Sequence, residues 1–386
     1  MLNKELIARE YHYLGDLIHV NTCMVGLLPA RVQAASNNFA LDHNEVALMT
    51  GKVSNEDTRM ETRALLAQLV GAAPEEIAFT RSTTEGLSIL AMGYPLGPGD
   101  NVVTCDLENP SNLYPWFNAA RQRGYEARVI HTDGSRLPIE DIRAAIDGNT
   151  KIVSLSTVQA GTGYYFDIAA VAELCHSAGA LLAVDGIQAI GRMNINVKKM
   201  GIDYLSCGGY KGLLAGFGTG FLYCRGDLIA SVTPPYAGPT SAVSAVSPPA
   251  VTPDPSFFEF APTAARFEAG THNAYGVTCM RASASLLLEL GLDNIEPHVL
   301  GLEQRLREQL AGQNIHWLGA DLPDRRSGVV TLTYPEAHYA KVAELLKERN
   351  ISLTHRPGYI RMCLSFYNTE EQVDVIADAF RAMANL

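Results

Sequence analysis

The sequence predicts an α/β protein built on a mostly parallel sheet that helices cover on both faces. Between about residues 58 and 225, segments with helical spacing of apolar residues alternate with short apolar or β-branched segments. Such alternation indicates a parallel sheet, because a parallel connection needs a crossover that is usually a helix. With 386 residues, 47% of them hydrophobic, the chain is long enough for one large domain and a smaller one.

The expected elements follow in chain order. Helices are expected at 58–70, 84–92, 112–123, 139–146 and 168–177, and strands at 101–105, 127–131, 152–156, 181–184 and 220–224. A long helix after residue 274 is expected to lead into a smaller α+β unit, on which the N-terminal helix packs. We therefore predict a large domain over 16–285 and a small domain formed by 1–15 and 286–386.

Residues 231–265 differ from the segments on either side, because prolines recur throughout them. This composition predicts a long extended loop rather than a linker between independent domains. A loop of this length favours a functional cover or a contact within a dimer.

Composition excludes several classes of function. A formal net charge of -11 and the lack of any lysine or arginine run argue against nucleic acid as a partner. No apolar run is long enough to span a membrane and no signal-like segment is present, so we expect a cytoplasmic protein. The seven cysteines form no C-x-x-C pair, which favours reduced thiols over disulfides or a metal site.

An aspartate and a lysine stand where a pyridoxal phosphate enzyme needs them. Asp185 ends the apolar run 180–184, Gln188 follows it, and Lys211 lies in a glycine-rich turn. In such an enzyme a carboxylate keeps the pyridinium nitrogen protonated, and a lysine forms a Schiff base with the cofactor. Ligands of parallel sheets bind at the carboxyl ends of the strands, where Asp185 is expected. By themselves, an aspartate and a lysine in these places are common in α/β proteins.

Two further tracts place hydroxyl groups before a helix. Ser82, Thr83 and Thr84 precede the predicted helix 84–92, and Thr271 follows Gly270 ahead of the helix expected after 274. Helix N-termini bind phosphate through their N–H groups and dipole. The alternative for the first tract is an ordinary N-cap with Glu85 in the first turn.

Together with these tracts, further motifs support a resemblance to a known family. They are Glu108-Asn109-Pro110-Ser111-Asn112, Arg266-Phe267-Glu268-Ala269-Gly270-Thr271, and Arg361 followed by Phe366-Tyr367-Asn368-Thr369. In this order the motifs resemble fold-type I pyridoxal phosphate enzymes of the class V aminotransferase family. The similar branch holds group II cysteine desulfurases, selenocysteine lyases, isopenicillin N epimerase, kynureninase and related carbon-sulfur lyases. The resemblance implies a mostly parallel seven-stranded sheet in the large domain and a smaller α+β C-terminal domain.

For the cofactor, pyridoxal 5'-phosphate, the resemblance implies one role for each matching residue. Lys211 is the Schiff-base and catalytic lysine, Asp185 pairs with the pyridinium nitrogen, and Gln188 meets the ring oxygen O3′. Asn109 lies at the ring face, where many relatives have His or Phe. The expected phosphate contacts are Ser82, Thr83, Thr84 and Tyr210, with Thr271 reaching over from the other subunit of a homodimer.

For the substrate, the resemblance implies that Arg361 binds the α-carboxylate of an amino acid as a bidentate fork, with help from Gln159. His355 and His272 are further candidates for substrate contact. Each has an alternative interpretation, a solvated loop for His355 and a helix-start histidine for His272.

One departure from the family pattern narrows the expected reaction. Group II desulfurases carry a nucleophilic cysteine before the carboxylate-binding arginine, whereas residues 348–358 contain none, and Cys363 lies in an expected strand. We therefore expect β-elimination from an L-amino acid, of the carbon-sulfur lyase type. Epimerisation or racemisation and transamination remain open, because all three reactions begin with removal of the α-proton.

Two rival functions are disfavoured. A nucleotide-binding dehydrogenase needs G-x-G-x-x-G after the first strand of a βαβ unit, and the glycines at 216, 218 and 220 have another spacing. A non-catalytic binding or regulatory protein with this fold is expected to lack Lys211 or Asp185, and both are present.

Overall fold

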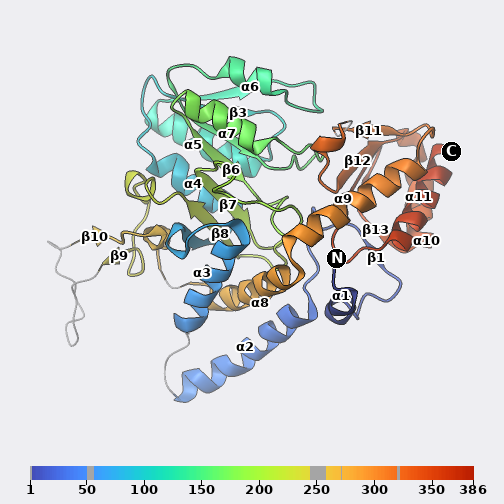
Figure 1. The fold of residues 1–386 in the computed structure, drawn as a ribbon, viewed down its shortest axis with the longest axis horizontal. Coiled ribbons are helices and arrows are strands. Elements are labelled where there is room, and N and C mark those ends of the chain that lie inside the picture. Colours follow the sequence, from blue (N-terminus) through green and yellow to red (C-terminus); the bar gives the residue numbers. More distant parts are fainter. Residues whose placement is uncertain (1, 50–55, 244–257, 271, 320–321) are drawn as a thin grey trace.

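The computed structural model describes residues 2–49, 56–243, 258–270, 272–319 and 322–386. The strands of its larger sheet are β2 (Ile77–Thr80), β3 (Asn101–Cys105), β4 (Glu126–Ile130), β5 (Thr150–Ser156), β6 (Leu181–Asp185), β7 (Tyr204–Gly208) and β8 (Gly220–Cys224). They lie in the order β2-β8-β7-β6-β5-β3-β4 (Figure 1). Only the pairs that include β8 are antiparallel, so the predicted mostly parallel seven-stranded sheet is confirmed.

Helices cover both faces of this sheet. They include α3 (Glu56–Val70), α4 (Thr83–Gly93), α5 (Pro110–Arg123), α6 (Ile139–Ala145), α7 (Ile168–Ser177) and α8 (Ala274–Leu290), whereas α2 (Ala30–Met49) packs against α8. Successive residues of β5 enter separate cores, because strand side chains alternate between faces. Ile152 packs in the core that contains Trp116 of α5, and Val153 in the one that contains Val171 of α7.

Two strands of the sheet, β2 and β7, were not predicted from the sequence. Every residue of both strands is buried, and β7 reads Tyr-Leu-Ser-Cys-Gly. A short strand covered on both faces shows no alternation of polar and apolar residues, so its sequence has no period to detect.

A second, antiparallel sheet follows in the C-terminal part. Its strands are β11 (His316–Leu318), β12 (Val329–Thr333), β15 (Tyr359–Cys363) and β14 (Thr354–Arg356), in that order, with α9 (Leu292–Gln309), α10 (Tyr339–Glu348) and α11 (Glu370–Ala384). Figure 1 shows this unit beside the larger sheet, with α8 and α9 leading from one to the other. The exact domain limits stay a prediction.

The N-terminal segment packs on the C-terminal unit. After α1 (Lys4–Glu10), the short β1 (Ile18–His19) pairs in parallel with β13 (Ile351–Ser352). The ring of Tyr11 lies 4.5 Å from that of Tyr367 between centroids. The N-terminal segment is therefore held in place by the C-terminal unit.

The proline-rich segment contains two short paired strands, β9 (Ala242–Val243) and β10 (Glu259–Phe260). Residues 244–257 lie outside the described part, so a role as cover or dimer contact stays a prediction. All seven cysteines are buried, free thiols, as the sequence indicated. Within the described ranges, no helix combines the length and hydrophobicity that crossing a membrane requires.

Candidate active site

The carboxyl ends of five strands converge on one pocket. Strands β2, β3, β5, β6 and β7 all run in the same direction, so their carboxyl ends lie at one edge of the sheet. A small, partly enclosed pocket lies at this edge. It is lined by Thr83, Asn109, Ser111, Ser156, Val158, Ala160, Asp185, Ile187, Gln188, Tyr210 and Lys211.

Lys211 and Asp185, the central pair of the prediction, both line this pocket. Lys211 is buried, and burial lowers the pKa of its ammonium group below the ordinary value. Burial raises the pKa of Asp185 to about 7. Among the described residues, only the N–H of Ile187 donates a hydrogen bond to the Asp185 carboxylate, over 2.9 Å. A buried carboxylate without a cationic partner fits the protonated ring nitrogen of a pyridoxal phosphate.

Gln188 also fits a polar ligand in the pocket. Its Nε2 donates to the backbone oxygen of Cys23 over 3.2 Å, while its Oε1 is buried and has no partner among the described residues. Since a carboxamide carries two N–H donors, a second donor remains for an oxygen of the cofactor. An orphaned buried polar atom is rare unless a ligand or water completes it.

Of the three hydroxyl residues at the start of α4, only Thr83 lines the pocket. Its Oγ1 accepts from the N–H of Gly208 over 3.0 Å. The Ser82 hydroxyl caps α4 by accepting from the N–H of Glu85 over 3.1 Å, the alternative that the sequence also allowed. Thr84 is exposed. The α4 N-terminus adds N–H groups and a positive dipole end, which suit a phosphate.

Arg361 lies at the border of the pocket on β15. Its Nη1 donates to the backbone oxygen of Ala160, a pocket residue, over 2.6 Å, and its Nη2 lies 3.0 Å from Sδ of Met24. Its Nε is buried and unpaired, and no carboxylate of the described residues forms an ion pair with it. A half-buried guanidinium without an anion fits the carboxylate of an amino-acid substrate.

Gln159, expected to assist Arg361, is held by Glu108. Its Nε2 donates to Oε1 of Glu108 over 2.6 Å and to Oγ of Ser156 over 3.0 Å, whereas its Oε1 is buried and unpaired. Burial raises the pKa of Glu108. Gln159 therefore presents an acceptor to a ligand, because its donors are used within the protein.

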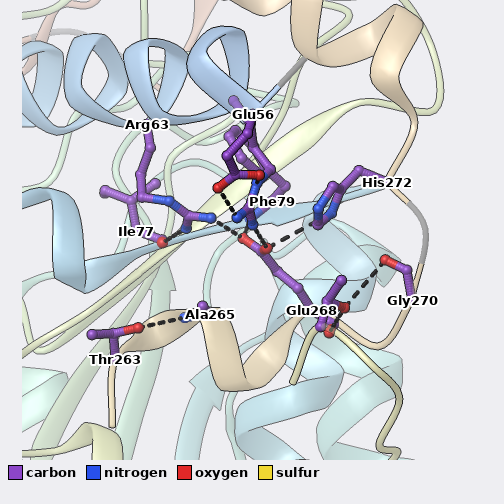
Figure 2. Close-up of polar contacts among 11 residues, drawn as sticks. Glu56, Arg63, Ile77, Phe79, Thr263, Ala265, Glu268, Gly270 and His272 are labelled. Atoms are coloured by element: carbon purple, nitrogen blue, oxygen red, sulfur yellow. Dashed lines mark hydrogen bonds and ion pairs between the residues drawn. The ribbon is translucent and has the colours of Figure 1, made fainter. Parts of the chain in front are cut away.

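His272 and the segment before it are fixed by Glu268 (Figure 2). Oε1 of the buried Glu268 accepts from the N–H of Phe79 and from Nη2 of Arg63, both over 2.9 Å. The ring of His272 lies edge-on to that of Phe79, with Nδ1 3.7 Å from Oε2 of Glu268. His272 thus has partners within its own chain. Thr271 lies outside the described residues.

His355 does not share a face of the small sheet with Arg361. On β14 it pairs with Ile360, whereas Arg361 pairs with Thr354, and successive strand residues point to opposite faces. Its ring stacks on Tyr339, and its Nε2 lies 2.5 Å from the hydroxyl of Tyr334. The sheet register therefore separates His355 from the substrate-binding candidates.

Sequence reasoning missed other parts of the site. Ser156 ends a predicted strand, so the strand-end rule was a usable signal for it. The sequence of residues 21–26 gave no indication that they belong to the site, although they pack against Lys211. The N–H of Gly26 donates to the backbone oxygen of Tyr210 over 2.8 Å. A Cβ at Gly26 would meet the backbone oxygen of Lys211 at 2.2 Å, so only glycine permits this approach.

Comparisons with known proteins identify the family and the fold. Residues 27–376 match the family model described as aminotransferase class-V. A probable cysteine desulfurase of Methanothermobacter thermautotrophicus is 26% identical, covering 100% of this chain and 99% of that protein. The apo structure of cysteine desulfurase from Thermococcus onnurineus has a TM-score of 0.87 at 25% identity, covering 100% and 98%.

A further solved structure, the cystine C-S lyase C-DES in complex with its product cysteine persulfide, has the same fold. Its TM-score is 0.86 at 21% identity, covering 97% of this chain and 99% of that one. The expected fold-type I pyridoxal phosphate enzyme of the lyase kind is confirmed. With nine-tenths of its length matched by one family model, the chain belongs to the class V aminotransferase family of pyridoxal phosphate enzymes.

Proposed function

We propose that the enzyme eliminates a sulfur-bearing group from Cβ of an L-amino acid such as cysteine or cystine. The observation that carries the proposal is the placement of Lys211, Asp185 and Arg361 around one pocket, each without an ionic partner in the described part of the chain. A base, an electron-sink partner and a carboxylate site are the groups that this reaction needs. The names of the relatives, desulfurases and a C-S lyase, support a carbon-sulfur bond as the target.

In this proposal the cofactor is held by residues of the pocket floor and edge. Asp185 keeps the ring nitrogen protonated, the free N–H of Gln188 meets O3′, and Asn109 lies at the ring. Thr83 and the N-terminus of α4 hold the phosphate, near Tyr210. Bound there, pyridoxal phosphate supplies an electron sink for the charge that develops at Cα.

Lys211 is proposed to hold the cofactor and then to move the α-proton. Burial lowers the pKa of its amine, which favours the neutral form that a base requires. Arg361 fixes the substrate carboxylate through its unpaired Nε and the N–H donors that its Nη groups do not use within the protein. Gln159 offers its unpaired Oε1 to a hydrogen of the substrate or cofactor.

Elimination is favoured over transfer of sulfur to the protein. Residues 348–358, which form the end of α10, β13 and β14, contain no cysteine that could take sulfur from a substrate beside Arg361. Elimination needs only a base and a leaving group at Cβ. The products are then a keto acid, ammonia and a free sulfur compound.

The proposal includes a cytoplasmic homodimer that has no nucleic-acid partner. Thr271 is proposed to reach the phosphate of the opposite subunit, and residues 16–285 to form the cofactor-binding domain.

The test is a product analysis of the cofactor-loaded protein with L-cysteine, L-cystine and, as a control without a leaving group, L-alanine. We expect pyruvate, ammonia and sulfide or persulfide from the sulfur amino acids only. Lys211→Ala is expected to lose both turnover and the visible absorbance of the lysine-linked cofactor, whereas Lys199→Ala, an exposed control, keeps both.

Two outcomes would contradict elimination. Alanine as product, together with a persulfide on Cys23 or Cys363, would show sulfur transfer to the protein. Solvent deuterium at Cα with inversion and without keto acid would instead show an epimerase.

A further inference from the structure

Four hydrogen-bond donors meet at one buried carboxylate next to the pocket. Oε2 of Glu108 accepts from Nδ2 of Asn112 over 2.9 Å. Its Oε1 accepts from the N–H and the hydroxyl of Ser156, over 2.8 and 3.0 Å, and from Nε2 of Gln159 over 2.6 Å. Glu108 is 5% exposed and forms no ion pair with any described residue. Hydrogen bonds from these neighbours therefore compensate the burial of the carboxyl group.

A chain of buried side chains fixes the direction of the bond from Asn112. Nε1 of Trp116 can only donate, and it donates to Oγ of Ser154 over 2.9 Å. The Ser154 hydroxyl donates to Oδ1 of Asn112 over 2.7 Å, which leaves Nδ2 of Asn112 for Glu108. The backbone N–H of Ser156 can also only donate. Each carboxyl oxygen of Glu108 therefore accepts from at least one donor whose direction is fixed.

Glu108 joins two walls of the pocket. Asn109 and Ser111 line the pocket from the start of α5, directly after Glu108, and Ser156 lines it from the end of β5. Ser156 also lies beside Asp185, because these two residues are paired in the parallel register of β5 and β6. The carboxyl group thus holds the turn after β3 against the strand end that neighbours Asp185.

The same carboxyl group holds the segment that Arg361 contacts. Gln159 is followed by Ala160, whose backbone oxygen accepts from Nη1 of Arg361 over 2.6 Å. The next backbone oxygen, that of Gly161, accepts from the hydroxyl of Thr331 over 2.8 Å. Thr331 is the partner of Arg361 in the pairing of β12 with β15. Residues 159–161 therefore connect Glu108 to the strand pair that carries the arginine.

We propose that Glu108 is a positioning residue for both halves of the site. It sets Asn109 and Ser156 against the cofactor and, through residues 159–161, sets Arg361 against the substrate carboxylate. Glu108 itself does not line the pocket, so it acts through these neighbours. The inference rests on the proposed function, which assigns the cofactor to this pocket and the carboxylate to Arg361.

Glu108→Gln separates positioning from bulk, because glutamine keeps the shape of the side chain but has one acceptor oxygen instead of two. Its NH2 group must then face a donor, either Nδ2 of Asn112 or the N–H of Ser156, so one contact is lost. Ser154→Ala is the matched control. Ser154 is fully buried in the same hydrogen-bonded chain, but it does not line the pocket. Both changes are expected to lower the unfolding temperature.

The cofactor half is tested by titrating pyridoxal phosphate into each cofactor-free protein. The apparent dissociation constant and the visible circular dichroism of the bound cofactor are measured. Glu108→Gln should weaken binding by about fivefold or more, the factor that corresponds to one lost hydrogen bond, and should change the dichroism. Ser154→Ala should keep the native values of both.

The substrate half is tested by spectral titration of the cofactor-loaded proteins with L-alanine and with ethylamine, which has no carboxylate. The ratio of the two half-saturating concentrations measures how strongly the site prefers a carboxylate. Glu108→Gln should lower this preference by about fivefold, and Arg361→Ala should abolish it. Ser154→Ala should keep it.

Native cofactor binding, dichroism and carboxylate preference in Glu108→Gln would overturn the inference, because Glu108 would then contribute to stability alone. A native preference in Arg361→Ala would instead contradict the proposed role of Arg361, and with it the substrate half of the inference. Glu108→Asp keeps two acceptor oxygens on a shorter side chain, so its values should lie between those of the native protein and Glu108→Gln. The same comparisons are made with Glu108→Asp if Glu108→Gln does not fold.

Discussion

Oε1 of Glu268 accepts a hydrogen bond from the backbone N–H of Phe79 over 2.9 Å, across 189 positions of sequence. Phe79 lies in β2, which leads to Thr83, and Glu268 begins the segment that leads to Thr271. One carboxylate thus joins the segment that leads to Thr83 to the segment that leads to Thr271, which are proposed to serve opposite sites of the dimer. Arg63 and Arg59 on α3 supply its positive partners.

Glu268→Gln is therefore expected to destabilise the fold strongly. The change leaves Arg63 buried without its counter-charge, and breaking a buried pair costs about 3–5 kcal/mol. Urea unfolding measures this free energy. Glu56→Gln is a matched control, because Glu56 also pairs with Arg59 but its side chain is 63% exposed. The control should cost no more than about 1 kcal/mol, and equal effects of both changes would argue against the role of Glu268.

The pH dependence of stability without cofactor should depend on Asp185. Its pKa is raised from 3.8 to about 7, so the folded state favours the protonated form. Its stabilising contribution is present below about pH 4 and is lost as pH rises through 7. Relative to native protein, cofactor-free Asp185→Asn should gain stability over this interval, by at most about 4 kcal/mol.

Thermal unfolding of both proteins from pH 4 to 8 measures the difference. Added pyridoxal phosphate should favour the native protein at neutral pH, since only an aspartate pairs with a protonated ring nitrogen. A difference between the two proteins that stays constant with pH would contradict the buried, unpaired state of Asp185.

Arg361→Ala should lower kcat/KM for amino acids by a factor of about 30 to 1,000. This corresponds to about 2–4 kcal/mol, the range for losing charge-assisted hydrogen bonds to a carboxylate. Steady-state kinetics measure it. Arg121→Ala, an exposed arginine on α5, serves as control and should keep native kinetics. Native kinetics in Arg361→Ala would exclude the carboxylate-binding role.

A shared site predicts complementation between two defective chains. Heterodimers of Lys211→Ala and Thr271→Ala chains contain one site with both groups intact, if Thr271 serves the opposite subunit. We expect purified heterodimers to recover activity that neither homodimer shows. No recovery, with Thr271→Ala itself impaired, would place Thr271 in the site of its own chain.

The sheet and the groups at its edge were largely predictable from the sequence. Asp185 and Gln188 follow a predicted strand, and sequence position alone fixes which edge of a parallel sheet they occupy. Lys211 follows β7, which was not predicted, so its place was expected from the motif and the family resemblance. Thr83 and Asn109 lie at helix starts, where cap residues mark the boundary. The structure brings these residues to one pocket, and their roles there stay predictions.

Positions that depend on pairing between distant segments were not predictable. His355 and Arg361 lie six residues apart, yet the register of β14 on β15 puts them on opposite faces. The approach of residues 21–26 to Lys211 depends on the pairing of β1 with β13, which no local pattern encodes. The N–H donors of Gln159 are used because Nε2 donates to Glu108, and Glu108 follows a different strand.

The pairing of β1 with β13 also constrains how the protein matures. Ile18 meets Ile351, so this pairing cannot form until nearly the whole polypeptide has left the ribosome. Closing so long a loop is slow, because its entropy must be lost before the contact forms. The strands of the larger sheet are synthesised much earlier. Lys211 and Asp185 can therefore take their places in this sheet before β1 pairs with β13. The arrangement proposed to bind substrate is therefore completed last, when the N-terminal and C-terminal segments pair.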